Sequence, residues 1–123
     1  MRKKISTLIN KFRNLAMERE EILKELLVDE PLIKGSLSLV KRTCGKPNCR
    51  CAQEPCHKAW VLRGAWEGRE RCQVVRKADV QDVQSLVDAC KLYQTHLRRL
   101  EAIAKQQKDI LRDLMERRRV KYK

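Results

Sequence analysis

The sequence predicts an α+β protein that is mostly helical, with two long helices flanking a small antiparallel β module. Apolar residues in the first and last parts of the chain recur at intervals of three and four, which is typical of amphipathic helices. The middle part instead alternates apolar and polar residues and contains most of the cysteines. These patterns divide the chain into three regions, residues 1–33, 34–77 and 78–123.

Residues 3–29 form the first predicted helix. Ten apolar residues between Ile5 and Leu27 recur mostly at three- and four-residue intervals, so they lie on one stripe of a helix. Pro31 and Gly35 follow the stripe, and both residue types end helices. The first region is therefore expected to be one amphipathic helix.

Residues 34–77 are expected to form the β module. Residues 36–40 alternate as a strand does, residues 60–63 are a second strand candidate, and residues 69–76 are a third. Gly64 and Gly68 bracket residues 65–67 as a tight connection, so the last two strands are predicted to form a hairpin. The Cys-rich residues 44–57 are then a long loop between the first two strands.

The third region is predicted to be a long coiled-coil-like helix with a basic tail. With Val83 as position a of a heptad, nine of the ten a and d residues as far as Leu114 are apolar or weakly polar. At 1.5 Å per residue this helix is about 60 Å long and the first about 40 Å, so antiparallel packing leaves part of the seam open. We expect a homodimer or larger assembly on this seam, built on Leu86, Tyr93, Leu97, Leu100, Leu111 and Leu114.

Positive charge is concentrated in the β module. The net charge of the chain is +13, and residues 34–77 alone hold 11 Lys and Arg against 3 Asp and Glu. This concentration favours a polyanionic partner, nucleic acid before an anionic membrane surface. No stretch approaches the roughly 20 apolar residues of a membrane span, and the apolar run after the basic N-terminus is too broken for an export signal. The sequence thus predicts a cytoplasmic protein without a membrane partner.

Five candidate metal ligands lie close together: Cys44, Cys49, Cys51, Cys56 and His57. Zn²⁺ prefers four tetrahedral Cys or His ligands, and a tight loop easily gathers ligands that are close in sequence. Adjacent side chains point apart, so the sensible sets are three cysteines with either Cys56 or His57. A reducing compartment favours metal over disulfides. We expect one structural Zn²⁺, and the spacing leaves reduced thiols in a loop as the alternative.

The other cysteines and the second histidine are interpreted as structural. Cys72 lies in the third predicted strand and Cys90 at a seam position, so both are expected to be small core residues. His96 occupies a g position of the heptad and is expected to be a solvated residue at the edge of the seam.

Two short runs, residues 33–37 and 44–52 (Cys-Gly-Lys-Pro-Asn-Cys-Arg-Cys-Ala), resemble an uncharacterised family of small proteins. These bacterial and archaeal proteins are often encoded near transposases and other mobile elements. In that family a His follows the third Cys, and an aromatic strand, a basic hairpin and a long helix come next. His57, Trp60 and the strand 69–76 match this order.

The resemblance has consequences for the site and for the setting. It favours His57 as the fourth zinc ligand, with Cys56 as the alternative, since the family pattern does not require Cys56. Lys58 and Ala59 depart from the Gly-Pro that usually follows the His. The resemblance also implies a DNA-associated setting, with a transposase or another mobile-element protein as a partner.

Together these features predict a zinc-stabilised, non-catalytic accessory protein of a mobile element that binds nucleic acid, DNA before RNA. The alternative is a coiled-coil adaptor with a purely structural zinc module. An enzyme is not expected, since no paired carboxylates adjoin the Cys loop and a four-ligand zinc leaves no position open for water. The candidate nucleic-acid contacts are Lys41, Arg42, Lys46, Arg50, Lys58, Arg63, Trp66, Arg69, Arg71 and Arg76.

Overall fold

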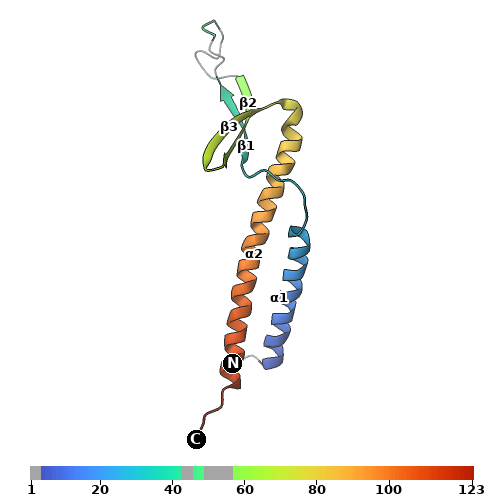
Figure 1. The fold of residues 1–123 in the computed structure, drawn as a ribbon, viewed down its shortest axis with the longest axis vertical. Helices are drawn as coiled ribbons and strands as arrows, with labels where there is room; N and C mark the ends of the chain where they lie inside the picture. The colour runs from blue at the N-terminus through green and yellow to red at the C-terminus, as the bar shows by residue number, and fades with distance from the viewer. Residues whose placement is uncertain (1–3, 43–45, 49–56) are drawn as a thin grey trace. The chain divides into compact units, whose positions relative to one another are not determined.

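The computed structural model describes residues 4–42, 46–48 and 57–123. In these residues two α-helices and one three-stranded antiparallel sheet are formed, which confirms the mostly helical α+β class (Figure 1). The chain divides into two compact units. One, called here the helical unit, combines Met1–Asp29 with Tyr93–Lys123, and the other, the sheet unit, is Glu30–Leu92.

The helical unit pairs α1 (Ile5–Leu26) with the later part of α2 (Val80–Arg118), and the two run antiparallel (Figure 1). α1 ends at Leu26, before Pro31, because the next apolar side chains, Leu27 and Val28, are exposed and no packing supports another turn. The core is aliphatic, and Leu8, Leu15 and Ile22 follow one another at seven-residue intervals. Its buried members are Leu8, Leu15, Ile22, Leu26, Ile103 and Ile110, and Phe12, Leu100 and Leu114 pack against them.

The face of α2 that packs on α1 is shifted from the predicted a and d seam to the d and g columns. Ile103, 0% exposed, and the buried Ile110 occupy g positions of the heptad counted from Val83. In contrast, the a residues Leu97 and Leu111 are 44% and 54% exposed. Apolar residues occupy the a, d and g columns together, a stripe wider than one helix contact, and α1 covers only the d and g columns. The expected assembly residues are therefore divided between an intrachain core and an open surface.

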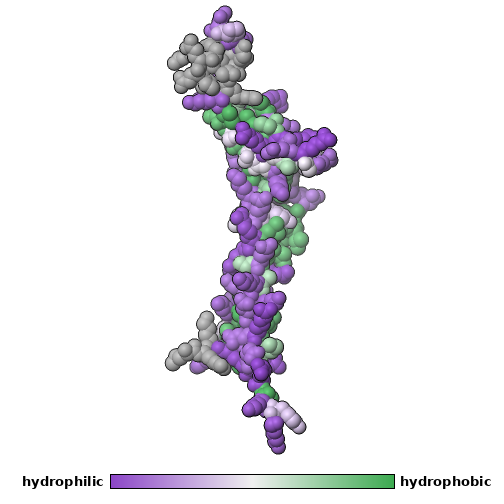
Figure 2. Space-filling model, turned by 90° about the vertical axis from the view of Figure 1, so that its left-hand side faces the viewer, coloured by the Kyte–Doolittle hydropathy of each residue, from purple (hydrophilic) through white to green (hydrophobic). Residues whose placement is uncertain are grey.

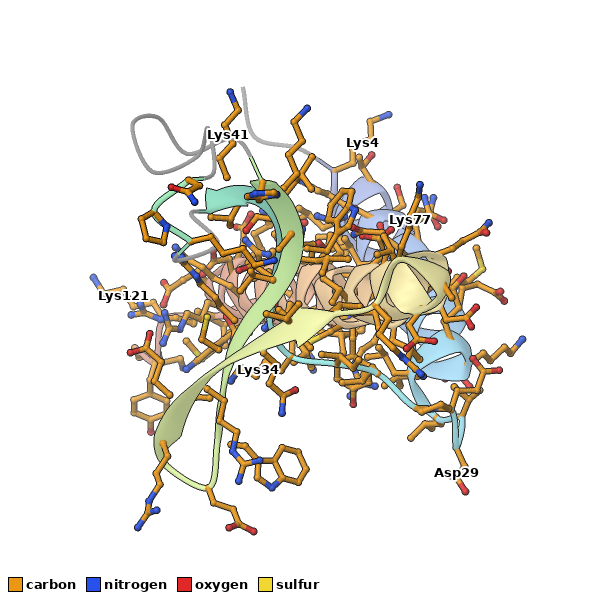
Figure 3. The ribbon with its side chains drawn as sticks, turned by 90° about the horizontal axis from the view of Figure 1, so that it is seen from above. Lys4, Asp29, Lys34, Lys41, Lys77 and Lys121 are labelled. Carbon is orange, nitrogen blue, oxygen red and sulfur yellow. The ribbon has the colours of Figure 1, made fainter. Side chains whose placement is uncertain are left out.

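The sheet unit contains β1 (Ser36–Arg42), β2 (His57–Trp66) and β3 (Arg69–Val75) in the order β1-β2-β3. Each pair is antiparallel, and the strands are strongly twisted (Figure 3). The predicted connection at residues 65–67 is wrong, because Trp66 still belongs to β2 and pairs with Arg69. The turn consists of Glu67 and Gly68, whose φ values of 53° and 77° are those of a two-residue type I′ hairpin.

Two glycines let the chain segment before β1 approach β2 closely. A Cβ on Gly64 would lie 2.6 Å from the carbonyl oxygen of Lys34, and one on Gly35 would lie 2.6 Å from that of Arg63. Any side chain at either position therefore clashes with backbone. The same segment is held from the other side by the amide of Ile33, which donates a hydrogen bond of 3.0 Å to the Leu86 carbonyl.

The described residues of the sheet unit form a small core. A 3₁₀-helical turn, Lys77–Asp79, leads into the first turns of α2. The buried apolar residues in the described part of this unit are Val61 at 3% exposure, Val87 at 0% and Cys90 at 6%. Cys90 is thus a core residue as expected. Cys72 is not, because it is exposed on the edge strand β3.

α2 ends at Arg118, close to the predicted end at residue 117. Residues 119–123 have no regular secondary structure, and Val120 and Tyr122 are each 93% exposed. Over the residues that the structure describes, neither helix is long and apolar enough to cross a membrane.

Candidate functional site

One face of the sheet collects cations and an aromatic ring. Strand residues alternate between faces, so Lys58 and Trp66, both at even positions of β2, share a face. The register adds Lys41 opposite Lys58, Arg71 opposite Gly64 and Arg69 opposite Trp66. This surface, called here the Trp66 face, contains Lys41, Lys58, Trp66, Arg69 and Arg71.

The other expected nucleic-acid contacts lie elsewhere. Arg63 is opposite Ser36 and Cys72, on the reverse face of the sheet. Arg76 follows β3, and its Nε donates a hydrogen bond of 3.0 Å to the Asp79 carboxylate. Lys46 is exposed in the short described segment 46–48, and Arg50 lies outside the described residues. For Arg42 the structure describes only the backbone, which pairs with His57.

Lys41 and Lys58 stand directly opposite each other on β1 and β2, and both are exposed. Figure 3 shows the Lys41 side chain extending away from the sheet. Like charges directly opposite on neighbouring strands destabilise a sheet. Within the described part of the chain, no ion pair engages either lysine, nor Arg69 or Arg71. This face therefore carries positive charge that no described acidic side chain neutralises.

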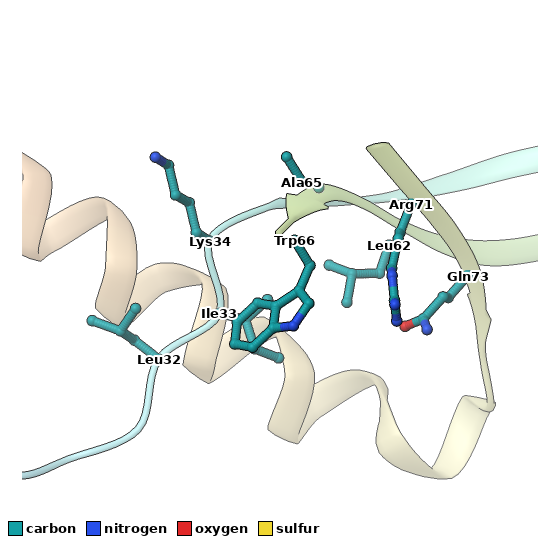
Figure 4. A pocket seen from close by; sticks show the side chains of 9 residues that line it. Leu32, Ile33, Lys34, Leu62, Ala65, Trp66, Arg71 and Gln73 are labelled. Atoms are coloured by element: carbon teal, nitrogen blue, oxygen red, sulfur yellow. The ribbon is translucent and has the colours of Figure 1, made fainter. Parts of the chain in front are cut away.

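A hollow of about 280 Å³ lies on the Trp66 face near the hairpin turn. Figure 4 shows the Trp66 ring with Arg71 and Gln73 around it, and Ile33 from the segment before β1. Trp66 is 66% exposed, so its ring is open to a ligand. The walls combine apolar side chains with a guanidinium and an amide. The lining residues are Leu32, Ile33, Lys34, Leu62, Gly64, Ala65, Trp66, Arg71 and Gln73.

Gln73 and Ile33 were missed by reasoning from the sequence. Gln73 comes into the hollow because it lies opposite Leu62, and that register depends on the position of the turn. The sequence signal was the pair Glu67-Gly68, in which Gly tolerates positive φ, and a two-residue turn there predicts the observed register. Ile33 has no comparable signal, since its place depends on the close approach at Gly35 and Gly64.

Of the expected zinc ligands, only His57 is described, and Cys44, Cys49, Cys51 and Cys56 lie outside the described residues. His57 was expected in the loop, but it is the first residue of β2, exposed, with its backbone opposite Arg42. That pair brings together the two ends of the segment 43–56. Among residues 4–42, 46–48 and 57–123, no group of three His, Cys, Asp or Glu side chains is placed to hold a metal.

The helical unit has polar contacts of a different kind. The Arg99 guanidinium donates two hydrogen bonds to the Glu18 carboxylate, the one from Nη2 measuring 2.7 Å. These bonds lower the pKa of Glu18 below its ordinary value. His96, expected to be solvated, is only 19% exposed, and its Nε2 lies 2.6 Å from the Glu25 carboxylate, outside hydrogen-bonding geometry. These contacts join α1 to α2 and form no candidate site.

Comparison with protein families matches residues 14–85 to DUF6788, a domain of unknown function. The chain belongs to this family. The matched range runs from within α1 through the Cys-rich segment and all three strands into the first turns of α2. No curated protein and no solved structure matches the DUF6788 chain.

Proposed function

We propose that this DUF6788 protein binds nucleic acid, DNA in the first place, through the Trp66 face of its sheet. The observation that carries the proposal is the unneutralised charge of this face, above all the lysine pair Lys41–Lys58. A sheet that only had to fold would gain from an acidic residue at either position. A bound phosphate between the two ammonium groups removes the repulsion.

Phosphate contacts supply most of the affinity that such a face offers. Arg69 and Arg71 extend the positive surface along β3, on the same face as Lys58. Four cations engaged with phosphates imply a slope of about −3.6 in a plot of log affinity against log salt, at about −0.9 per contact. Because strands hold these side chains, less ordering is needed on binding than for charges on the irregular residues 119–123.

Trp66 and the hollow beside it add a place for a base. An exposed indole stacks on an unpaired base with about 1–3 kcal/mol per base, whatever the sequence. The guanidinium of Arg71 and the amide of Gln73 border the same hollow and offer hydrogen bonds to a base edge or to a phosphate. An unpaired or extruded base therefore suits this end of the sheet.

A structural Zn²⁺ is part of the proposal. Cys44, Cys49, Cys51 and His57 would hold it, with Cys56 in place of His57 as the alternative. The pairing of Arg42 with His57 is compatible with such a site, because the two ends of the Cys segment meet there. Bound zinc would supply folding free energy to the segment that carries Lys46 and Arg50.

We propose no catalytic role. Four protein ligands leave zinc without an open position for water, and the Trp66 face presents cations and an aromatic ring, with no nucleophile and base side by side among its residues. The resemblance of the Cys motif to proteins encoded near transposases supports an accessory role in a mobile element, with a transposase or another protein of that element as a partner.

A fluorescence-anisotropy titration at two salt concentrations tests the proposal, with duplex DNA, single-stranded DNA and RNA of equal length. The double variant Arg69→Ala/Arg71→Ala should reduce the magnitude of the salt slope by about 1.8, because two phosphate contacts are lost. Trp66→Ala should weaken single-strand binding by about 5- to 150-fold, the equivalent of 1–3 kcal/mol. The matched control is Arg63→Ala, on the reverse face of the same strand as Trp66.

Equal losses for Arg63→Ala and for the double variant would show that the Trp66 face is not the binding surface. If the native protein binds none of the three ligands at low salt, the nucleic-acid proposal is wrong. The second candidate function, a coiled-coil adaptor with a purely structural zinc module, then takes its place. One observation favours that candidate, the exposed apolar residues of α2, among them Leu97 and Leu111.

A further inference from the structure

A row of exposed apolar residues runs along α2 in the helical unit, beside the face that α1 covers. Its larger members are Tyr93 at 38% exposure, Leu97 at 44%, Leu111 at 54% and Met115 at 58%, and the exposed Ala104 lies at its centre. At 100° per residue these five positions fall within about 40° of one another around the helix. Figure 2 shows one face of the molecule, where apolar residues in green lie among charged residues in purple.

The spacing of this row is symmetric. Counted outwards from Ala104, Leu97 and Leu111 lie seven residues to either side, and Tyr93 and Met115 lie eleven. In a symmetric dimer the same patch serves both subunits, so residue i meets residue j and j meets i. An antiparallel pairing centred on Ala104 fulfils this condition for every member of the row.

We propose that a second copy of this chain packs antiparallel on this row, with the two-fold axis at Ala104. Leu97 then faces Leu111 of the second copy, and Tyr93 faces Met115 of the second copy. Ala104 faces itself, and its small side chain lets the two helices approach closely at the axis. Burial of Leu97, Leu111 and their equivalents provides the hydrophobic driving force.

Charge at the edge of the row selects the antiparallel orientation. Glu101 and Lys108 are exposed on the same edge, three residues before Ala104 and four after it. Neither takes part in an ion pair within the described part of the chain. Antiparallel pairing about Ala104 sets Glu101 of each copy against Lys108 of the other. In a parallel, in-register pair each of these residues would instead stand level with its own equivalent.

A shallow hollow lies at one end of the row, where the proposed pairing places a side chain of the second copy. It is lined by Leu111, Leu114, Met115, Arg118 and Arg119 and has a volume of about 330 Å³. The antiparallel pairing places Tyr93 of the second copy over it. The apolar floor and the arginines at its rim suit a tyrosine ring, which combines an apolar body with a polar end.

Sedimentation equilibrium of the native chain without nucleic acid tests the assembly, and a dimer at micromolar concentration is expected. Leu97→Lys/Leu111→Lys should be monomeric over the same range, with unchanged helix content because both residues are exposed. The matched control is Met17→Lys on α1, 63% exposed and outside the row, which should leave the dimer intact. A monomeric native chain, or a dimer that survives the double variant, overturns the proposal.

Carbodiimide cross-linking of a mixture of ¹⁴N- and ¹⁵N-labelled chains tests the orientation. The zero-length link Glu101–Lys108 should appear between chains, because within one helix seven residues span about 10 Å. Glu101→Lys should weaken the dimer about 2- to 30-fold, the range for two exposed ion pairs, and Glu101→Lys/Lys108→Glu should restore it. A dimer without the mixed-label link, or one that the reversed pair does not restore, contradicts the antiparallel arrangement. Since nucleic acid is absent, these results do not depend on the proposed function.

Discussion

The two units of this chain are stabilised differently. The helical unit buries six aliphatic residues in one continuous core, from Leu8 to Ile110. The sheet unit buries three apolar residues in its described part, and Leu39, Trp66 and Val74 remain 48–66% exposed. A core this small needs support from elsewhere, and metal binding is a common source in small domains. The helices thus have the larger described core, and we propose that zinc bound by the Cys segment supports the sheet.

The two units also differ in the pairing of their charged side chains. In the helical unit several charged side chains pair with one another, as Glu18 does with Arg99 and Asp113 with Arg117. In the described part of the sheet unit, Lys41 and Lys58 stand opposite each other without an acidic partner. Internal pairing serves the fold, whereas charge that is left unpaired is available to a ligand. The sheet unit is for this reason the part of the molecule to which we assign binding.

The largest expected effect is the loss of zinc. Cys49→Ala should unfold the sheet unit and leave the helical unit folded, since structural zinc contributes roughly 10–16 kcal/mol of apparent folding free energy. NMR reports the two parts separately, because both tryptophans, Trp60 and Trp66, lie in β2. The control is Cys72→Ala, which removes an exposed cysteine and should change nothing. Native indole signals and no metal in the reductively purified protein would contradict the zinc proposal.

Measuring the metal content also distinguishes the two candidates for the fourth zinc ligand, His57 and Cys56. Cys56→Ala should retain one zinc per chain, and His57→Ala should lower zinc affinity, because His57 is the expected ligand. The opposite result would make the site an all-cysteine one and would assign His57 to the sheet alone, as the first residue of β2.

The next largest effect concerns the core of the helical unit. Ile103→Ala should lower the free energy of unfolding by about 2–5 kcal/mol, since Ile103 is 0% exposed and its truncation leaves a cavity in the core. Urea unfolding followed by circular dichroism measures this loss. The matched control is Ile5→Ala at 42% exposure, for which roughly 0.5 kcal/mol is expected. Equal losses for both variants would mean that the helices do not pack by the core described.

A smaller effect is expected in the sheet unit at its close backbone approach. Gly64→Ala should cost about 1–3 kcal/mol, because the new Cβ would lie 2.6 Å from the Lys34 carbonyl oxygen. Gly68→Ala should cost about 1–2 kcal/mol for another reason, its φ of +77°. Asn tolerates positive φ, so Gly68→Asn should recover part of the loss while Gly64→Asn should not. Thermal unfolding followed by tryptophan fluorescence distinguishes the two causes.

The smallest effect is the acid dependence of the helical unit. Hydrogen bonds from Arg99 lower the pKa of Glu18 in the folded state, so the unfolded chain binds a proton there more readily. This contribution to stability is complete above the ordinary Glu pKa of about 4.3 and is lost as the pH falls through the lower folded value. Glu18→Gln and Arg99→Gln should therefore both flatten the fall in stability below about pH 4. If stability still falls as steeply below about pH 4 in either variant, this pair does not contribute to the acid dependence of stability.

Much of the local structure could be predicted from the residues alone. The helical periods around Leu15 and Ile110, and the alternation of β1, indicated the right elements. The basic hairpin and Trp66 were likewise placed in one module. The face of the cations on β3 could not be predicted, because a change in the turn changes which residues pair across the strands. With the turn at Glu67 and Gly68, Arg71 shares the face of Trp66. Arg63 lies on the reverse face by strand alternation alone.

The sequence by itself determined the elements, because helix and strand periods depend on neighbours a few residues away. It also determined where the charge is concentrated and that four of the six cysteines come together in one short segment. Tertiary packing decided which columns of α2 became a core. Apolar residues extend over three adjacent columns, and a single α1 covers only those of Leu100 and Ile103. The column of Leu97 and Leu111 remains open, and it is this open column that we assign to a second copy of the chain.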